Sequence, residues 1–361
     1  MNFRITIIFV LVAALSVKLH AQNSVNVGIS KIEFTDESRL AWNGKGPRPI
    51  TSHIFYPTKA ENVEPVMLGE PDEPLFNAGN AVWGAKPVNK IALPLVIMSH
   101  GTGGSALQML WLAEHLVKHG YLVIGVNHHG NTAIEPKKYA EAYKLWWERT
   151  LDLSVVLNEL SQHRLWSGYI DNDKIGVVGF SLGGYTAISA IGGITDKTLF
   201  AKFCQSPKRD FTCDAQLEFS SIDKEFKKVK DTARVKESML RQGDSFKISA
   251  IKAAFVLAPA VAQSITEKSL QNIIIPVRVV VGSNDKVAPA LSNAKRVSSL
   301  IKAAKYSEID KVGHYTFLSN CTSLGKKYLS ELCLDHKDIV REDVHQRIGK
   351  DAVEFFDSVF F

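Results

Sequence analysis

The chain has 361 residues, of which 45% are hydrophobic and 22% are charged. This composition is typical of a folded globular protein and excludes a largely disordered one. The 43 basic and 37 acidic residues give a formal net charge of +6, and they are spread without a long block of one sign. The charge pattern therefore gives little support to nucleic-acid binding, and we expect no nucleic-acid partner.

The first 21 residues have the pattern of a secretory signal peptide. Arg4 precedes an apolar run over residues 5–17, which is too short to span a bilayer, since a spanning helix needs ~20 residues. Ala21 offers a small residue at a cleavage site. We expect cleavage after Ala21, export to the periplasm or the medium, and no stable membrane insertion afterwards. An uncleaved N-terminal anchor is the alternative.

Apolar runs alternate with amphipathic stretches from about residue 93 onward, which predicts parallel βαβ units and an α/β fold over residues 22–361. Two strands are expected earlier, at 24–33 and 50–56, and the Pro-, Gly- and Asn-rich stretch 57–92 is expected to be a long surface loop. Later strands are predicted at 94–99, 121–126, 174–179, 253–257, 273–281 and 306–309. Helices are predicted at 106–119, 139–163, 181–191, 290–303 and 344–360.

Residues 195–248 differ in composition from the rest of the chain. Charged residues dominate there, and Lys and Glu alternate with Phe and Val. We interpret this stretch as an inserted helical cap, and the alternative is a surface excursion with no role at the functional site.

The four cysteines fall into two close pairs. Because an oxidising compartment allows disulfides to persist, disulfides are favoured over free thiols in an exported chain. Local pairing is favoured among the three possible connectivities. Zinc binding is the weaker alternative, since neither pair has Cys-x-x-Cys spacing. The two expected disulfides are Cys204 with Cys213 and Cys321 with Cys333.

A nucleophile motif follows the predicted strand 174–179. The hexapeptide GFSLGG at residues 179–184 fits G-x-S-x-G and precedes a predicted helix. In this context the serine lies on a sharp turn that exposes its hydroxyl, and flanking glycines relieve the close contacts of that turn. Ser181 is therefore the predicted nucleophile.

A serine nucleophile needs a base, and the base needs an acid that orients it. Asp285 follows the predicted strand 273–281, and His314 follows the next strand. The order Ser, Asp, His is that of the α/β-hydrolase fold and differs from the order in other triad folds. Among the eleven histidines, position favours His314 over the other histidines considered, which are His100, His128, His129, His336 and His345.

The loop SHGTGG at residues 99–104 follows the strand 94–99. Its glycines let the backbone approach a substrate, so it is the expected second half of an oxyanion hole. The backbone N–H of Leu182 is one expected donor, and Thr102 is the favoured partner with Gly103 second. A plain flexible loop is the alternative.

Several of these motifs resemble a known family. SHGTGG, the stretch NHHGNT at 127–132, Trp147-Glu148-Arg149 with Asp152, GFSLGG, and HYTFLSNC at 314–321 resemble the bacterial predicted dienelactone hydrolases, which look related to secreted platelet-activating-factor acetylhydrolases. The resemblance implies an α/β-hydrolase that cleaves esters with the triad Ser181, Asp285 and His314. True dienelactone hydrolases use a cysteine nucleophile, so dienelactone chemistry is not implied.

The expected function is hydrolysis of small-molecule carboxylic esters with short or lipid-like acyl groups, without a metal or organic cofactor. An amidase or peptidase using the same triad is the first alternative. A non-catalytic binding protein on the same scaffold is the second, and the presence of all three triad residues argues against it. Asn131, Trp147 and Arg149 are interpreted as supports for the fold rather than as a substrate mouth. The oligomeric state is left open.

Overall fold

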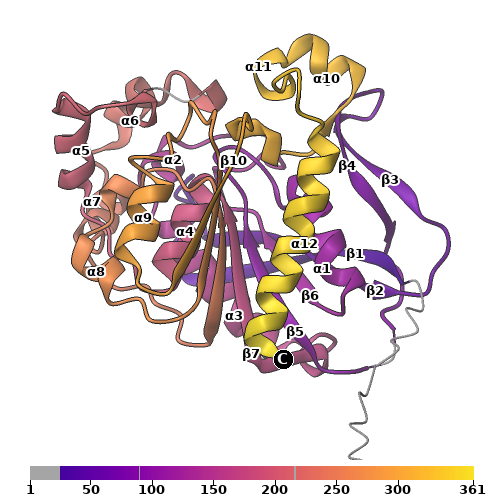
Figure 1. Ribbon diagram of the computed structural model, residues 1–361. Helices are drawn as coiled ribbons and strands as arrows, with labels where there is room; N and C mark the ends of the chain where they lie inside the picture. The colour runs from indigo at the N-terminus through magenta and orange to yellow at the C-terminus, as the bar shows by residue number, and fades with distance from the viewer. Residues whose placement is uncertain (1–24, 89, 215–216) are drawn as a thin grey trace, which may run out of the picture.

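The computed structural model describes residues 25–88, 90–214 and 217–361, so the predicted signal peptide lies outside the described residues. A mostly parallel sheet forms the centre of the molecule (Figure 1). In spatial order its strands are β10, β9, β8, β7, β5, β6, β2, β1, β4 and β11, and β3 pairs with β4. The parallel part comprises β5 (Leu93–Ser99), β6 (Leu122–Val126), β7 (Ile170–Phe180), β8 (Ile251–Leu257), β9 (Val277–Gly282) and β10 (Ala304–Ile309).

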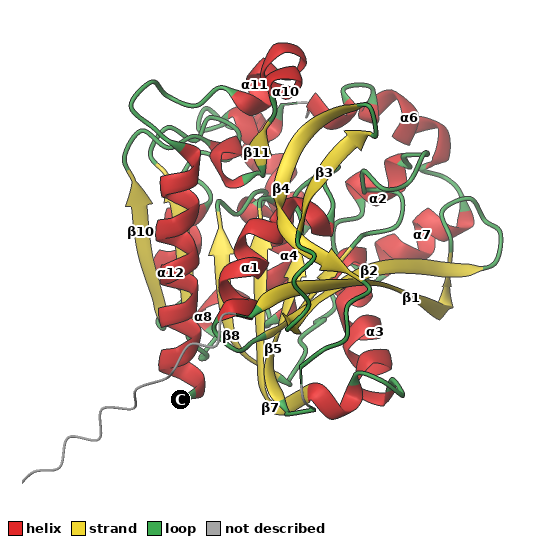
Figure 2. Ribbon diagram, turned by 90° about the vertical axis from the view of Figure 1, so that its right-hand side faces the viewer, coloured by secondary structure: helices red, strands yellow, loops and turns green. Residues whose placement is uncertain are grey.

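The central strands are buried because helices cover both faces of the sheet. Helix α1 (Leu110–Lys118) packs with α12 (Arg341–Phe360) on one face, and α3 (Glu148–Gln162) packs with α4 (Leu182–Ala190) on the other (Figures 1 and 2). A strand covered on both faces reads as a continuous apolar run, which is why the sequence predicts β5 and β6 well. An added Cβ at Gly176 would lie 2.4 Å from the Phe356 ring. The absence of a side chain at this position therefore allows α12 to pack closely against β7.

The stretch 57–92 is not a long loop, and that prediction is wrong. After β1 (Asn26–Leu40) and β2 (Pro47–Thr58), it contains β3 (Glu64–Glu70) and β4 (Glu73–Trp83), which form an antiparallel pair. Pro65 and Pro74 lie in these strands at the edge of the sheet, where a missing N–H is tolerated. Register shifts near Gly69 further weaken the alternation of apolar and polar residues. The short strand β11 (Asn320–Cys321) pairs with β4.

The predicted helix 139–163 is two helices. Helix α2 (Ala140–Lys144) ends before Leu145, and α3 begins at Glu148. The intervening Leu145, Trp146 and Trp147 are all buried, so the break places three large side chains in the core. The remaining helices outside residues 195–248 are η1 (Ala106–Met109), η2 (Ser167–Tyr169), η5 (Ala262–Ser264), α8 (Glu267–Gln271), α9 (Ala294–Leu300), η6 (His314–Phe317), α10 (Ser323–Tyr328) and α11 (Ser330–Cys333).

The described part of residues 195–248, here called the cap segment, is helical. It contains α5 (Lys197–Gln205), η3 (Phe211–Cys213), η4 (Leu217–Phe219), α6 (Ile222–Val229) and α7 (Ala233–Leu240). In Figure 1 these helices lie at the upper left, beside α2 and α9. The Trp147 indole donates to the Ser238 carbonyl at 3.1 Å, and Arg241 pairs with Glu148 at 2.8 Å. These contacts attach α7 to the start of α3.

Two disulfides lie in the segments beyond the carboxyl edge of the sheet. Cys204 is bonded to Cys213 within the cap segment, and Cys321 is bonded to Cys333, which joins β11 to α11. These are the two local pairs of cysteines. Across residues 25–88, 90–214 and 217–361, no helix combines the length and the apolar character that a bilayer crossing requires.

Candidate active site

Ser181 lies on a sharp turn between β7 and α4, at the carboxyl edge of the sheet. Its φ of 56° and ψ of −119° are unusual for a residue with a side chain. Close contacts with the backbone exclude a side chain at the glycines on either side of Ser181. A Cβ on Gly179 would lie 1.9 Å from the Gly183 carbonyl oxygen, and one on Gly183 would lie 1.9 Å from the Ser99 carbonyl oxygen. The turn therefore tolerates no side chain at either position without a shift of the backbone.

The structure brings Ser181, Asp285 and His314 together. Asp285 follows β9, and His314 begins η6 after β10. His314 Nδ1 lies 2.7 Å from Asp285 Oδ2, and His314 Nε2 lies 2.9 Å from Ser181 Oγ. With the proton on Nδ1, the imidazole donates to the carboxylate and accepts the serine O–H, which is the arrangement of a hydrolytic triad.

The carboxylate of Asp285 is fixed from both sides. Its Oδ1 accepts the backbone N–H groups of Val287 at 3.0 Å and Ala288 at 2.7 Å, which leaves Oδ2 for His314. Asp285, His314 and Ser181 are each buried. Because the carboxylate cannot rotate without losing two hydrogen bonds, it holds the imidazole in one orientation.

The loop at residues 99–104, here called the oxyanion loop, lies against the nucleophile, since a Cβ on Gly101 would lie 3.3 Å from Ser181 Cβ. Thr102 and Leu182 both line a cavity at Ser181. Gly103, with φ of 63°, donates its N–H to Asn131 Oδ1 at 2.6 Å. Its N–H is therefore engaged within the protein. The geometry favours Thr102 over Gly103 as the donor that accompanies Leu182.

Asn131 and Arg149 support this loop from behind. Asn131 also donates to the Ala142 carbonyl at 3.1 Å, so it connects the loop to α2. Arg149 donates to the carbonyl of His100 and, at 3.2 Å, to Thr186 Oγ1 on α4. The guanidinium thus ties the oxyanion loop to the helix that follows Ser181. Both residues contact the fold and do not line the cavity.

A buried charge cluster lies beneath Arg149. Asp152 on α3 accepts from Arg39 at 2.6 Å and from Arg48 at 2.8 Å, and Asp36 and Glu148 each pair with Arg39. Arg241, which is partly exposed, also pairs with Glu148, so each of the three buried carboxylates has at least one guanidinium partner. Buried ions persist where they are paired and hydrogen-bonded.

His128 belongs to this cluster and not to the triad. Its Nδ1 lies 2.9 Å from Asp152 Oδ2, and its Nε2 lies 2.9 Å from Ser99 Oγ. Burial and the charge of Arg149 together lower the pKa of His128 to about 3, against the raising effect of Asp152. His128 is therefore neutral near pH 7 and acts as a hydrogen-bonding support for the end of β5.

The cavity at Ser181, here called the acyl cavity, has a volume of about 90 Å³. Its walls combine the triad turn with the cap segment and with the broken helix at 145–147. Most of the large side chains around it are aromatic or aliphatic, namely Tyr143, Trp146, Leu182, Phe200, Phe219, Ile222, Val261 and Val287. Polar side chains, among them Thr102, Lys144 and Asp223, share this lining, so the cavity offers both apolar and polar contacts to a group attached to the reacting carbon.

Two buried polar groups near the oxyanion loop were not predicted. Within the described residues, Tyr143 Oη and Glu218 Oε2 have no hydrogen-bond partner. A Cβ on Gly103 would lie 3.1 Å from Tyr143 Oη and 3.0 Å from Glu218 Cβ. Burial raises the pKa of Glu218, against the lowering effect of His314 and of a hydrogen bond from Tyr315. Glu218 lies in the charge-rich cap segment, so no sequence motif distinguishes it.

The described residues contain no group of three or more His, Cys, Asp or Glu side chains that could hold a metal ion. The triad can transfer a proton from a serine to a histidine, and the oxyanion loop can stabilise an oxyanion. Together these two steps are the chemistry of acyl transfer.

Comparison with known proteins agrees with this architecture. Residues 81–215 match the model of the Dienelactone hydrolase family, and this stretch carries Ser181 and the oxyanion loop. A solved ferulic acid esterase from Streptomyces cinnamoneus has a similar structure, with a TM-score of 0.62 and 17% identity over 92% of this chain and 90% of that chain. No curated protein sequence matches the chain. The predicted fold and the resemblance are confirmed: the protein has the α/β-hydrolase fold.

Proposed function

We propose that the protein is a carboxylic ester hydrolase that forms an acyl-enzyme on Ser181, with His314 as the general base and Asp285 as the orienting acid. The observation that carries the proposal is the continuous hydrogen-bond chain from Asp285 through His314 to Ser181. These residues come from three separate segments, and they meet at the carboxyl edge of a sheet, beside a glycine loop and a cavity.

The proposed reaction follows from this geometry. Ser181 Oγ forms a bond to the ester carbonyl carbon while its proton passes to His314 Nε2, and the oxyanion accepts from the N–H groups of Leu182 and Thr102. The bond from carbon to the alcohol oxygen then breaks, and His314 gives its proton to that oxygen. Water repeats the sequence in the second half-reaction, which releases the acid and restores Ser181.

Two finer features belong to the proposal. The aromatic and aliphatic side chains in the lining of the acyl cavity support esters of short-chain or lipid-like acyl groups. The two disulfides support a protein exported to an oxidising compartment, either the periplasm or the medium, because such bonds are rare in the cytosol.

The test is covalent labelling with a fluorophosphonate followed by mass spectrometry and by assays with p-nitrophenyl esters. We expect a single adduct on Ser181 and turnover of the esters, and both should be lost in Ser181→Ala and His314→Ala. Ser358→Ala, on α12, is the matched control and should behave as the wild type. An adduct without ester turnover would favour an amidase. A folded protein with no adduct would contradict the triad and favour a binding protein.

A further inference from the structure

A buried hydrogen-bond chain at the end of β5 has the same order of groups as the triad. His128 Nδ1 lies 2.9 Å from Asp152 Oδ2, and His128 Nε2 lies 2.9 Å from Ser99 Oγ. All three side chains are fully buried, and none of them lines the acyl cavity. The chain from Asp152 to Ser99 therefore does not contact substrate, and any effect on the reaction must pass through the residues that it holds.

The groups around this chain fix the direction of each hydrogen bond. Asp152 pairs with two arginines, so it is a carboxylate that can only accept, and the proton of His128 is on Nδ1. Because the imidazole is neutral near pH 7, its Nε2 accepts the O–H of Ser99. Arg149 donates an N–H to the same hydroxyl oxygen at 3.4 Å. The hydroxyl of Ser99 is thus held from two sides.

His100 continues the chain into the backbone of the oxyanion loop. The backbone N–H of His128 donates to His100 Nε2 at 3.3 Å, and His100 Nδ1 lies 2.7 Å from the Gly101 carbonyl oxygen. Burial lowers the pKa of His100 well below its ordinary value, so this ring is also neutral. Since its Nε2 accepts, its proton is on Nδ1 and is donated to the Gly101 carbonyl.

These and neighbouring contacts occupy polar backbone groups of the oxyanion loop but leave one N–H free. The carbonyl of His100 accepts from Arg149, and the N–H of Gly103 donates to Asn131. Within the part of the chain that the structure describes, the N–H of Thr102 donates to no protein group. The loop is therefore held so that the N–H of Thr102 remains available for an oxyanion.

Ser99 also contacts the turn that carries the other expected donor. A Cβ on Gly183 would lie 1.9 Å from the Ser99 carbonyl oxygen, so the turn with Leu182 packs directly against Ser99. One residue thus lies between the two halves of the oxyanion hole. A displacement of Ser99 would change the spacing between the N–H groups of Thr102 and Leu182.

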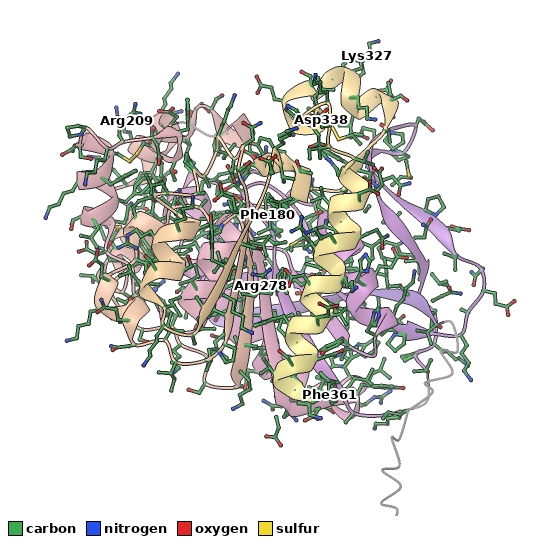
Figure 3. The ribbon with its side chains drawn as sticks, viewed as in Figure 1. Phe180, Arg209, Arg278, Lys327, Asp338 and Phe361 are labelled. Atoms are coloured by element: carbon green, nitrogen blue, oxygen red, sulfur yellow. A yellow bond between two sulfur atoms is a disulfide. The ribbon has the colours of Figure 1, made fainter. Side chains whose placement is uncertain are left out.

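The oxyanion loop rests on the interior of the molecule. A Cβ on Gly101 would lie 3.1 Å from the ring of Phe180, which is buried at the end of β7. Figure 3 shows Phe180 near the middle of the molecule, below the peripheral Arg209 and Lys327. The loop therefore packs on a fixed surface below, and the hydrogen bonds of His128 and His100 determine its position along that surface.

We propose that His128 and Ser99 are positioning residues for the oxyanion hole, and that their hydrogen bond sets the spacing between the N–H groups of Thr102 and Leu182. This inference rests on the proposed function and deepens it. The carbonyl oxygen of an ester gains negative charge only when Ser181 attacks, so a misplaced donor weakens binding of the transition state and not of the substrate.

Ser99→Ala in the full mature protein is the first test. The change removes only the hydroxyl that lies between His128 and Arg149. We expect kcat for p-nitrophenyl butyrate to fall at least tenfold, with KM within threefold of the wild type, because the oxyanion no longer meets a well-placed donor. Ser52→Ala is the matched control, since Ser52 is also fully buried in a strand and its hydroxyl has no partner among the described residues. It should leave both parameters unchanged.

A pair of inhibitors separates positioning from general damage to the site. A trifluoromethyl ketone bonds through its carbonyl carbon to Ser181 Oγ while the serine proton passes to His314, and its oxygen becomes an oxyanion. The methyl ketone with the same alkyl chain binds without forming this adduct to a comparable extent. In Ser99→Ala the inhibition constant of the trifluoromethyl ketone should rise by about the same factor as kcat falls, and that of the methyl ketone should not change.

Two variants of His128 test the hydrogen bond itself. Glutamine can place a carbonyl oxygen near the position of Nε2 and accept from Ser99, whereas phenylalanine fills a similar volume without an acceptor. We expect His128→Gln to have at least tenfold higher kcat than His128→Phe. If His128→Phe does not fold, the comparison of Ser99→Ala with Ser52→Ala tests the proposal without it.

The outcomes are distinguishable. A folded Ser99→Ala protein with the kcat of the wild type would overturn this inference, while its ester turnover upheld the proposed function. Equal weakening of both ketones would also overturn it, because a general structural role would affect both. A wild-type protein that hydrolyses no ester and gives no adduct on Ser181 would be a failure of the proposed function.

Discussion

Ser181 holds a left-handed φ that costs about 1–3 kcal/mol for a residue with a side chain. The surrounding contacts maintain this conformation, because β7 enters the turn and α4 leaves it at close approach to the loop after β5. The sequence predicts this turn well, since a glycine-flanked serine between an apolar strand and a helix is typical of a nucleophile turn. Asp285 and His314 are also predictable, because each follows a strand and parallel strands end at the same edge.

The positions of Tyr143 and Glu218 beside the oxyanion loop could not be predicted from the sequence. Their position beside Gly103 depends on the break between α2 and α3 and on the path of the cap segment. Neither feature has a signal in the local sequence. Contacts between a cap and a core are long-range, so periodicity cannot place them.

Gly183 provides a test of the close approach at the nucleophile turn. In Gly183→Ala the new Cβ would meet the Ser99 carbonyl oxygen at 1.9 Å, so the oxyanion loop or α4 must move. We expect a loss of roughly 2 kcal/mol or more in unfolding free energy and at least a hundredfold loss of kcat/KM, measured by urea denaturation and ester turnover. Gly243→Ala, where the nearest atom is 3.9 Å away, is the control. Wild-type behaviour of Gly183→Ala would contradict this packing.

Asp285 provides a test of imidazole orientation. Asp285→Asn keeps the size of the side chain but removes the carboxylate that accepts from His314 Nδ1, so the histidine loses its correct tautomer. We expect kcat to fall by about 10³–10⁴-fold with a thermal midpoint within a few degrees of the wild type. A loss of less than tenfold in steady-state turnover would show that another group orients His314.

At the scale of elements, prediction succeeds where burial is uniform and fails where it is not. The parallel strands β5, β6, β8 and β9 are mostly apolar and buried, and the sequence places them within a few residues. The hairpin of β3 and β4 contains proline and glycine at a sheet edge, so its alternation is obscured. The split of 139–163 into α2 and α3 is invisible to helical periodicity, because buried residues continue through the break.

The disulfide between Cys321 and Cys333 tests the anchoring of α10 and α11 to the rest of the fold. It closes a loop with a sequence separation of 12 residues. A disulfide that closes a loop of this length lowers the conformational entropy of the unfolded chain. The double variant Cys321→Ser/Cys333→Ser should therefore lose about 2–3 kcal/mol of unfolding free energy, measured by urea denaturation. Full reduction should remove the difference between variant and wild type. A difference that persists in reductant would show that the serines act through packing.

At the scale of the whole molecule, one edge of one sheet collects every part of the site. The nucleophile turn, the acid, the histidine and the oxyanion loop follow β7, β9, β10 and β5 respectively. Parallel topology makes this convergence predictable from strand order. The cap segment and the α10–α11 segment are less predictable, because both are insertions whose packing the strand pattern does not determine.

Buried neutral histidines predict acid sensitivity of the whole fold. Burial lowers the pKa of His53 and of His345 to about 4 and that of His128 to about 3, against an ordinary value of 6.5. The unfolded chain therefore binds protons first as the pH falls, so stability is full above about pH 6.5 and is lost from there toward pH 4.

His345, which stacks on Trp111, gives the matched variant for this effect. We expect each of these histidines to cost about 2 kcal/mol of unfolding free energy between pH 7 and pH 5, seen as a falling urea midpoint. His345→Asn should make the dependence on pH shallower, although it lowers stability at pH 7 by removing the stacked ring. An unchanged slope would contradict a neutral His345.

The two disulfides have a consequence for how the protein is made. Each joins cysteines that are near neighbours in the chain, 9 and 12 residues apart, and the pairs do not interleave. Cys204 and Cys213 are translated more than a hundred residues before Cys321, so the first bond can close before the second pair reaches the oxidising compartment. Sequential oxidation in order of synthesis then yields the native bonds directly. Production of the active protein should require an oxidase but no disulfide isomerase.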